Sequence, residues 1–321
     1  MVIEHACPHA LPKPWGVKDL SPWSSARADG NTIGEIWYER SDNVAAAPSL
    51  LLKLLFTSQP LSIQVHPDDA YAHSMGLRSG KTEVWYVLSA VPEGKVALGL
   101  SRHLTPLQLR AAIGDGSIAD LVVWRTVSAN DVIFVPAGTI HAMGAGLVVA
   151  ELQQRSDVTF RLFDYGRKRE LHAESAIVVA ETGPADFQVR PNQFTAERKL
   201  FASNPYFVFE RIDLGPNSNW CLEAERETWL LVLSGSASAG SFDVAIGDAL
   251  FAQADRLDIH TGADGMVGLA AYTGGGPIPH LLQRLSPLGL IHVEPPREMQ
   301  VLPSPAQAKA HPKNASLDTI K

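Results

Sequence analysis

Short apolar runs between breaking residues are the feature of this chain that most restricts its fold. The runs are rich in Val, Ile and Phe, and Gly, Pro and Asp separate them. In the first half they cover residues 33–39, 62–66, 84–88, 96–100, 131–135, 148–153 and 158–163. Runs this short are typical of strands, and their number predicts a mainly β protein built as an antiparallel sandwich or barrel of the jelly-roll kind.

Two segments of the first half predict helices instead. Thr105 and Pro106 form an N-cap followed by proline at the first helical position, which opens a helix running to about Ile113. The alanine-rich segment from Leu171 to Glu181 also favours a helix, although two adjacent valines weaken the prediction. We therefore expect a few short helices beside the sheets.

The second half repeats the strand-like pattern. Near residues 184–197, Pro, Asn, Gln and charged residues replace the apolar runs, and new runs follow at 206–214, 228–234, 242–244, 249–252 and 267–272. The pentapeptide at 247–251 (GDALF) echoes the one at 130–134 (NDVIF), which predicts a duplicated jelly roll. We expect one domain at 1–185, a second at 186–280, and a Pro-rich, partly mobile C-terminal extension at 281–321.

Four potential metal ligands lie in three segments of the first half. Gln64 and His66 are two residues apart, so a strand would place both side chains on one face, about 7 Å apart. Glu83 lies at another strand-like run and His141 follows the turn at 136–138, so the four side chains can converge inside one barrel. Two imidazoles and a carboxylate commonly bind a divalent metal that keeps a position open for chemistry, and imidazoles favour zinc over magnesium. The sequence therefore predicts one Zn²⁺ per chain. The second half has no such ligand set.

These motifs resemble the zinc site of the type I mannose-6-phosphate isomerases, a family of the cupin superfamily. The resemblance rests on the Gln64–His66 pair, on GKTE at 80–83 and on PAGxxH at 136–141. WG at 15–16, IGE at 33–35 and the segment from Ser156 to Arg161 follow the family's order, so the match covers roughly residues 12–280. Because only about 57 residues separate Glu83 from His141, the chain is similar to the short, mainly bacterial form.

The resemblance implies a two-barrel (bicupin) fold and an aldose–ketose isomerase. Such an enzyme interconverts mannose 6-phosphate and fructose 6-phosphate by moving a proton between C2 and C1 through an enediol(ate). The first domain would hold the zinc and the active site, and the second would be free of metal. The substrate of this reaction is a small sugar phosphate.

Arg161 is the first candidate for catalysis. If residues 158–163 form a strand, alternation places the Arg161 side chain on the face away from the apolar Phe160 and Leu162. A cation on the cavity face of a barrel strand is costly to bury without an anionic partner, although a structural salt bridge would also explain it. The resemblance places Arg161 at the family's catalytic arginine, where it binds sugar oxygens and stabilises developing negative charge.

Four more residues are candidates on the same grounds. Lys81 should share the face of Glu83, and it either transfers a proton or pairs with phosphate. Glu151 and Asp157 match acidic positions of the family's site, and either could shuttle the proton. Ser62 shares the face of Gln64 and could bind a substrate oxygen. The simpler alternative for all four is that they only hydrogen-bond to the metal ligands and orient them.

Composition excludes some other functions. The formal charge of −7 argues against nucleic-acid binding, which normally requires a basic face. The most apolar stretch, Leu50–Phe56, is interrupted by Lys53 and is far too short to span a membrane, and the N-terminus has no apolar run for export. We therefore expect a cytoplasmic monomer or small homo-oligomer without nucleic-acid or membrane partners.

Two alternatives remain open. A non-catalytic bicupin that binds or senses a sugar phosphate would share the fold, but such a protein is expected to have lost a ligand or Arg161. An iron-dependent cupin oxygenase would usually carry more histidines than this set, which contains Gln64 and Glu83.

Overall fold

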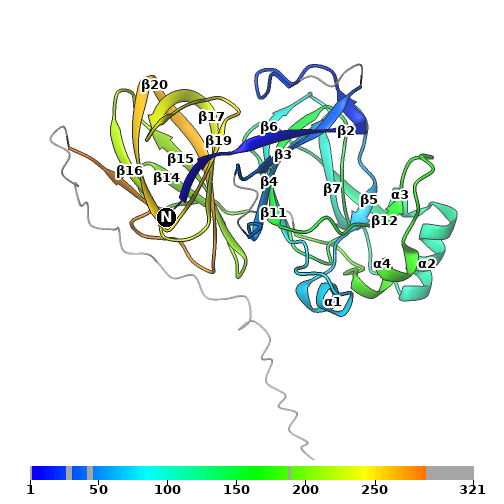
Figure 1. Ribbon diagram of the computed structural model, residues 1–321. Coiled ribbons are helices and arrows are strands. Elements are labelled where there is room, and N and C mark those ends of the chain that lie inside the picture. The colour runs from blue at the N-terminus through cyan, green and yellow to red at the C-terminus, as the bar shows by residue number, and fades with distance from the viewer. Residues whose placement is uncertain (1, 27–30, 42–45, 187–188, 287–321) are drawn as a thin grey trace, which may run out of the picture.

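The computed structural model describes residues 2–26, 31–41, 46–186 and 189–286 of the 321-residue chain. Within these ranges the protein is mainly β with four short helices, in agreement with the predicted class. The predicted mobile extension lies almost entirely outside the described residues. Figure 1 shows two β units side by side, one formed by the first half of the chain and one by the second.

The first half forms two antiparallel sheets with a buried apolar core between them. The six-stranded sheet has the order β2 (Cys7–Val17), β3 (Ile33–Glu39), β4 (Leu50–Thr57), β11 (Leu147–Gln154), β6 (Glu83–Ala90) and β9 (Val132–Val135). The five-stranded sheet has the order β12 (Phe160–Phe163), β5 (Ile63–Val65), β10 (His141–Met143), β7 (Lys95–Leu100) and β8 (Val122–Thr126).

The six-stranded sheet is buried on both faces. Its inner face lines the first-half core, and its outer face packs against aromatic residues of the second half, such as Phe207 and Trp229. This explains β4, in which all eight residues are buried. The sequence did not predict this strand, and the run was tested only as a membrane span. A strand buried on both faces lacks the alternation of polar and apolar residues by which strands are identified.

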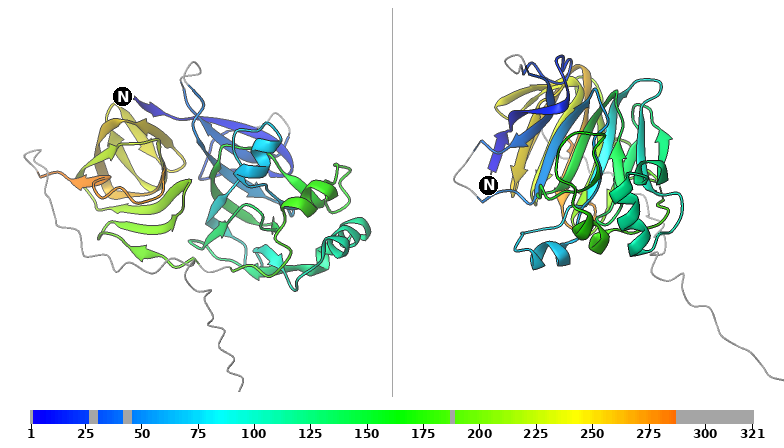
Figure 2. Two further views of the ribbon diagram at one scale, coloured as in Figure 1. Left: turned by 90° about the horizontal axis from the view of Figure 1, so that it is seen from below. Right: turned by 90° about the vertical axis from the view of Figure 1, so that its right-hand side faces the viewer.

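The helices cover the other face of the five-stranded sheet or flank its ends. They are α1 (Asp69–Ser74), α2 (Pro106–Asp115), α3 (Ile118–Leu121) and α4 (Ala173–Val179). Figure 2 shows α2 and α4 on the side of the first half that faces away from the second. The predicted helix at Thr105 is confirmed as α2: Thr105 and Gln108 form a reciprocal capping box, with Pro106 at the first helical position.

The second half forms one ten-stranded sheet system. Its strands are β1 (Val2–His5), β13 (Asn192–Gln193), β14 (Arg198–Ser203), β15 (Phe207–Leu214), β16 (Asn219–Ala224), β17 (Thr228–Ala239), β18 (Phe242–Ala245), β19 (Ala249–Gln253), β20 (Asp255–Thr273) and β21 (Leu282–Arg284). Strand β1 comes from the segment assigned to the first predicted domain, but it pairs with β19.

A charged pair lies inside the second half. Arg198 and Glu210 are completely buried and form two hydrogen bonds of 2.8 Å. The hydroxyl of Tyr272 donates to the same carboxylate at 2.5 Å, and the remaining guanidinium nitrogen donates to the Ile278 carbonyl at 2.9 Å. Both carboxylate oxygens therefore have partners.

The two echoing pentapeptides form equivalent turns. Asn130 and Gly247 both adopt left-handed backbone conformations, with φ of 74° and 86°. Each donates its N–H to a carbonyl of the neighbouring strand, at 2.8 and 2.9 Å. The following aspartates, Asp131 and Asp248, each accept from the backbone N–H three residues earlier, at 2.7 and 2.9 Å. The repeat seen in the sequence is thus also a repeat of local structure.

Long apolar helices are absent from the part of the chain described here: none of its helices could cross a membrane.

Candidate metal centre

Three strands bring the predicted ligands together. His141 begins β10 and pairs directly with Gln64 on β5, while His66 follows the end of that strand. Glu83 is the first residue of β6, in the opposite sheet. Ligand atoms of His66, Glu83 and His141 all lie within 4.8 Å of one another, and the three side chains are buried. The end of the first-half core therefore contains a compact cluster of donor atoms.

Hydrogen bonds orient both imidazoles toward this cluster. Nδ1 of His66 lies 2.8 Å from the Val158 carbonyl, and Nδ1 of His141 lies 2.8 Å from the Thr139 carbonyl. A carbonyl only accepts, so each Nδ1 carries the hydrogen and each Nε2 directs a lone pair at the cluster. Burial lowers the pKa of both imidazoles, which keeps them in the neutral form that binds metals.

Glu83 completes the cluster. Its carboxylate oxygens lie 3.3 Å from Nε2 of His66 and 4.0 Å from Nε2 of His141. Oε2 accepts a hydrogen bond from Trp85 at 3.0 Å, whereas the buried Oε1 accepts none. Ligands about 2.0–2.2 Å from a shared ion in tetrahedral geometry lie roughly 3.3–3.6 Å apart, so the spacing of Glu83 and His66 fits a divalent metal, whereas the distance of 4.0 Å to His141 is longer.

Gln64 lies between the two imidazoles. Its Nε2 is 3.5 Å from Nε2 of His66 and 3.3 Å from Nε2 of His141, and its Oε1 accepts from the Ser62 hydroxyl at 3.0 Å. A half-turn of the amide exchanges oxygen and nitrogen, and the Ser62 oxygen can accept as well as donate. The side chain is therefore able to present its oxygen to a cation.

Lys81 contacts the cluster from one side. Its Nζ lies 2.7 Å from Oε1 of Glu83 and 3.2 Å from Nε2 of His66. The contact with Glu83 is an ion pair whose geometry does not meet that of a hydrogen bond. Burial alone would lower the pKa of Lys81, but the charges of Glu83 and Glu151 outweigh it and raise that pKa. Burial would likewise raise the pKa of Glu83, but the charge of Lys81 holds it well below its usual range. The pair is thus charged.

Glu151 lies on the same inner face, opposite Lys53 on β4. The two side chains are almost fully buried, and Nζ and Oε1 are 3.5 Å apart. Burial, reinforced by the charge of Glu83, raises the pKa of Glu151 to about 7, although Lys53 opposes the shift. A carboxyl with such a pKa can exchange protons near neutral pH.

The structure places Arg161 and Asp157 at the edge of the cluster. Arg161 pairs with Gln64 across β12 and β5, and its guanidinium donates to the Glu170 carbonyl at 2.9 Å. Burial and the nearby Arg169 lower the pKa of Arg161. Asp157 is exposed, and its charge acts on both Lys81 and Arg161. Of the predicted site residues, these two are therefore the least enclosed.

The sequence did not predict that Glu35 and Lys13 extend the buried charged pair of Glu151 and Lys53. Glu35 accepts from the Trp37 indole at 2.7 Å and pairs with Lys13 at 3.2 Å. Lys53 also lies over the Trp37 ring, 4.5 Å from its centroid. The sequence feature that could have indicated these residues is Lys53, a single lysine in the leucine-rich run of β4, whose side chain lies on the inner face of the sheet.

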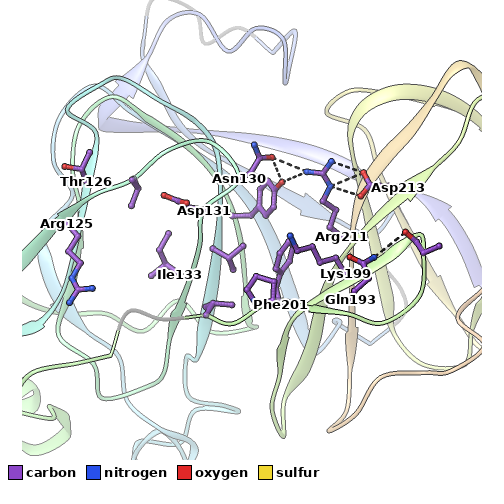
Figure 3. A pocket seen from close by; sticks show the side chains of 16 residues that line it. Arg125, Thr126, Asn130, Asp131, Ile133, Gln193, Lys199, Phe201, Arg211 and Asp213 are labelled. Atoms are coloured by element: carbon purple, nitrogen blue, oxygen red, sulfur yellow. Dashed lines mark hydrogen bonds and ion pairs between the residues drawn. The ribbon is translucent and has the colours of Figure 1, made fainter. Parts of the chain in front are cut away.

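A cavity of about 660 Å³ lies elsewhere, between the two halves (Figure 3). The hydroxyl of Tyr86 donates to Asn130 at 2.6 Å, and Arg211 donates to both, at 3.1 and 3.2 Å. Tyr86 is on the face of β6 opposite Glu83. None of the predicted site residues lines this cavity. We therefore centre the candidate site on the donor cluster and not on this cavity.

Comparison with known proteins points to one family. No family model matches the chain. The mannose-6-phosphate isomerase of Streptococcus mutans is 33% identical over 218 residues, covering 65% of this chain and 67% of the relative. The probable mannose-6-phosphate isomerase GmuF of Bacillus subtilis is 33% identical over 227 residues, covering 64% and 70%.

The fold agrees with this relationship. The crystal structure of the mannose 6-phosphate isomerase from Bacillus subtilis matches with a TM-score of 0.73 and 23% identity, over 85% of this chain and 100% of that one. The resemblance drawn from the motifs around Gln64, Glu83 and His141 is thereby confirmed. This chain is an enzyme of the type I mannose-6-phosphate isomerase family, in the cupin superfamily.

Proposed function

We propose that the protein is a zinc-dependent isomerase that interconverts mannose 6-phosphate and fructose 6-phosphate. The observation that carries the proposal is the donor cluster: two neutral imidazoles and a buried carboxylate with one unbonded oxygen. Gln64, His66, Glu83 and His141 would hold one zinc ion per chain. When bound, zinc would supply a Lewis acid that stabilises negative charge on the sugar oxygens.

Glu151 is our candidate for the proton shuttle. From mannose 6-phosphate, a base takes the proton from C2, the electron pair forms the enediolate, and a proton is returned to C1, while the proton of the C2 hydroxyl passes to the oxygen on C1. The C1 aldehyde thus becomes an alcohol while the C2 alcohol becomes the ketone, with no oxidant or reductant needed. The raised pKa of Glu151 supports this role. Asp157 and Lys81 remain candidates, but Asp157 is exposed and Lys81 is held in its charged form.

Three other residues would bind the substrate. The Arg161 guanidinium would hold sugar oxygens and stabilise the charge that develops on them. The Lys81 ammonium lies beside the cluster and offers a second cation. The Ser62 hydroxyl, 3.0 Å from the Gln64 oxygen, would bond a sugar hydroxyl.

We further propose that the chain is a bicupin with a metal-binding domain at 1–185, a metal-free jelly roll at 186–280 and an extension at 281–321. The equivalent turns at Asn130 and Gly247 support a duplication. Cytoplasmic location and a monomer or small homo-oligomer, without nucleic-acid or membrane partners, complete the proposal.

The decisive experiment combines metal analysis with turnover. Purified protein is analysed for metal content, and fructose 6-phosphate formation from mannose 6-phosphate is followed in a coupled assay. We expect about one zinc per chain, loss of turnover after chelation, and recovery when zinc is added back. A fully zinc-loaded protein that binds mannose 6-phosphate without converting it would instead be a non-catalytic sugar-phosphate sensor.

A further inference from the structure

Asp69 has a function in the structure that its position at a helix start does not explain. The preceding residue, Asp68, is the N-cap of α1 and accepts the hydrogen bond from Tyr71 N–H at 2.8 Å. The carboxylate of Asp69 is thereby released from capping. Its Oδ1 accepts from Gly80 N–H at 2.7 Å and from the Gln154 side-chain amide at 2.9 Å.

Gln154 carries this connection onward. Its side chain is 5% exposed, and both of its polar atoms have partners. Oε1 accepts from Thr82 N–H at 3.0 Å, while Nε2 donates to Asp69. One amide thus joins α1 to the segment that enters β6, and Gly80 and Thr82 are fixed on either side of Lys81.

The same point connects all three ligand-bearing segments. Lys81 N–H donates to the Pro67 carbonyl at 3.0 Å, directly after His66. The Thr82 hydroxyl accepts from Ala137 N–H at 3.2 Å, in the turn that leads to His141. A side chain at Gly80 would come within 2.7 Å of the backbone at 67–69, so these segments lie in direct contact there.

We propose that Asp69 and Gln154 are positioning residues that set the separation of the metal ligands. They act on the backbone that carries Lys81 and Glu83, and thereby hold Glu83 at the distance from His66 that a metal requires. This inference rests on the metal site proposed above. It differs from that proposal because it concerns how tightly the ligand set is held, which can be measured without any turnover.

A matched pair of variants tests the role of Asp69. Asp69→Ala removes the acceptor, whereas Asp69→Asn keeps an oxygen for both Gly80 N–H and the Gln154 amide. Zinc affinity is measured by competition with a chromophoric chelator. We expect Asp69→Ala and Gln154→Ala to weaken zinc binding by about 10- to 100-fold, the usual effect of removing a group that supports a ligand, and Asp69→Asn to stay within about threefold of the wild type.

Amide hydrogen exchange of the metal-free protein provides a second readout. We expect exchange in residues 80–86 to accelerate in the two alanine variants and not in Asp69→Asn. A double Asp69→Ala, Gln154→Ala variant should lose less zinc affinity than the two single losses combined, because each single variant already breaks the hydrogen bond that joins the two side chains.

Three results would overturn the inference. Asp69→Ala could bind zinc as tightly as the wild type, Asp69→Asn could be as weak as Asp69→Ala, or the single effects could simply add. Failure of the proposed function would look different: the wild type itself would then bind no zinc, or would bind zinc without converting mannose 6-phosphate.

Discussion

The interiors of the two halves both contain buried charged side chains, but these side chains are bonded differently. The equivalent turns donate their N–H groups to the carbonyls of Val87 in one half and Val232 in the other. Glu83 and Thr228 lie four residues before these carbonyls, so they occupy matching positions. The partner strands place Gln153 opposite the first and Tyr272 opposite the second. The proposed metal ligand Glu83 of the first half is therefore matched by an uncharged threonine in the second.

The buried carboxylate of Glu210 in the second half has a hydrogen bond on each oxygen. Glu210 lies opposite Ala270 on the neighbouring strand, in the same way that Lys53 lies opposite Glu151. Arg198 and Tyr272 donate hydrogen bonds to the Glu210 carboxylate, and together these occupy both oxygens. In the first half, one oxygen of Glu83 lacks a hydrogen bond. Both oxygens of Glu210 are thus hydrogen-bonded, whereas Oε1 of Glu83 has only the ion pair with Lys81 and is the oxygen that a ligand could use.

The largest effect should follow from making the first half resemble the second. Glu83→Thr removes the carboxylate and leaves the buried Lys81 without its partner. We expect zinc content to fall to background and turnover to become undetectable, as shown by elemental analysis and the coupled assay. Retention of one zinc per chain with normal turnover would refute the ligand role of Glu83.

Glu151→Gln should give the next largest effect. The amide keeps the shape of the side chain but cannot accept a proton. We expect kcat to fall by about 10²–10⁴-fold, as is usual for a lost general base, while zinc content remains normal. Arg161→Ala serves as the companion variant, with a loss of about 10²–10³-fold. An unchanged kcat in Glu151→Gln would direct attention to Asp157 or Lys81.

Breaking the charged pair of the second half should affect stability alone. Arg198→Met leaves Glu210 buried without its cation, so we expect the free energy of unfolding to fall by about 3–5 kcal/mol in denaturant titrations. The double variant Arg198→Met, Glu210→Leu should recover most of that loss. Zinc affinity should stay unchanged in the double variant, and a marked loss there would mean that the halves do not separate structure from function.

The stability of the metal-free protein should depend on pH through Glu151. The folded state binds this proton up to about pH 7, whereas the unfolded state releases it near its ordinary pKa of 4.5. The contribution is therefore fully present below about pH 4.5 and is lost as the pH rises to about 7, on the order of 3 kcal/mol. Unfolding titrations at several pH values should show this slope, and Glu151→Gln should remove it.

The smallest effects should come from exchanging residues between the equivalent turns. A side chain at Gly247 would come within 2.0 Å of the Trp23 carbonyl, so Gly247→Asn should cost about 1–3 kcal/mol. Asn130→Gly relaxes the backbone but loses the bond to Tyr86, so we expect a net change of about 1 kcal/mol or less. Thermal denaturation of both variants checks the order, which would be reversed if the turns were not equivalent.

Sequence reasoning predicted the parts of the molecule that depend on local spacing. The Thr105 cap, most strands of the first half and the four residues now found together could all be identified, because alternation and capping act within a few residues. The proximity of Gln64 and His66 needed only a two-residue period.

Features that depend on strand register could not be predicted this way. The Lys53–Glu151 pair requires knowing that β4 lies beside β11, almost 100 positions later in the chain. β20 is much longer than the run at 267–272 that pointed to it, because its first part is polar and exposed on alternate residues. The connection through Asp69 likewise joins residues distant in sequence, since its partners Gly80 and Gln154 lie 11 and 85 positions later.

The pairing of β1 with β19 has a consequence for synthesis of the chain. Residues 2–5 are translated about 250 residues before their partners at 250–253. The N-terminal segment must therefore wait, unpaired, until most of the protein has been translated. A bulky fusion next to residues 2–5 would lie beside the edge strand of this sheet, so a tag is better placed away from this segment.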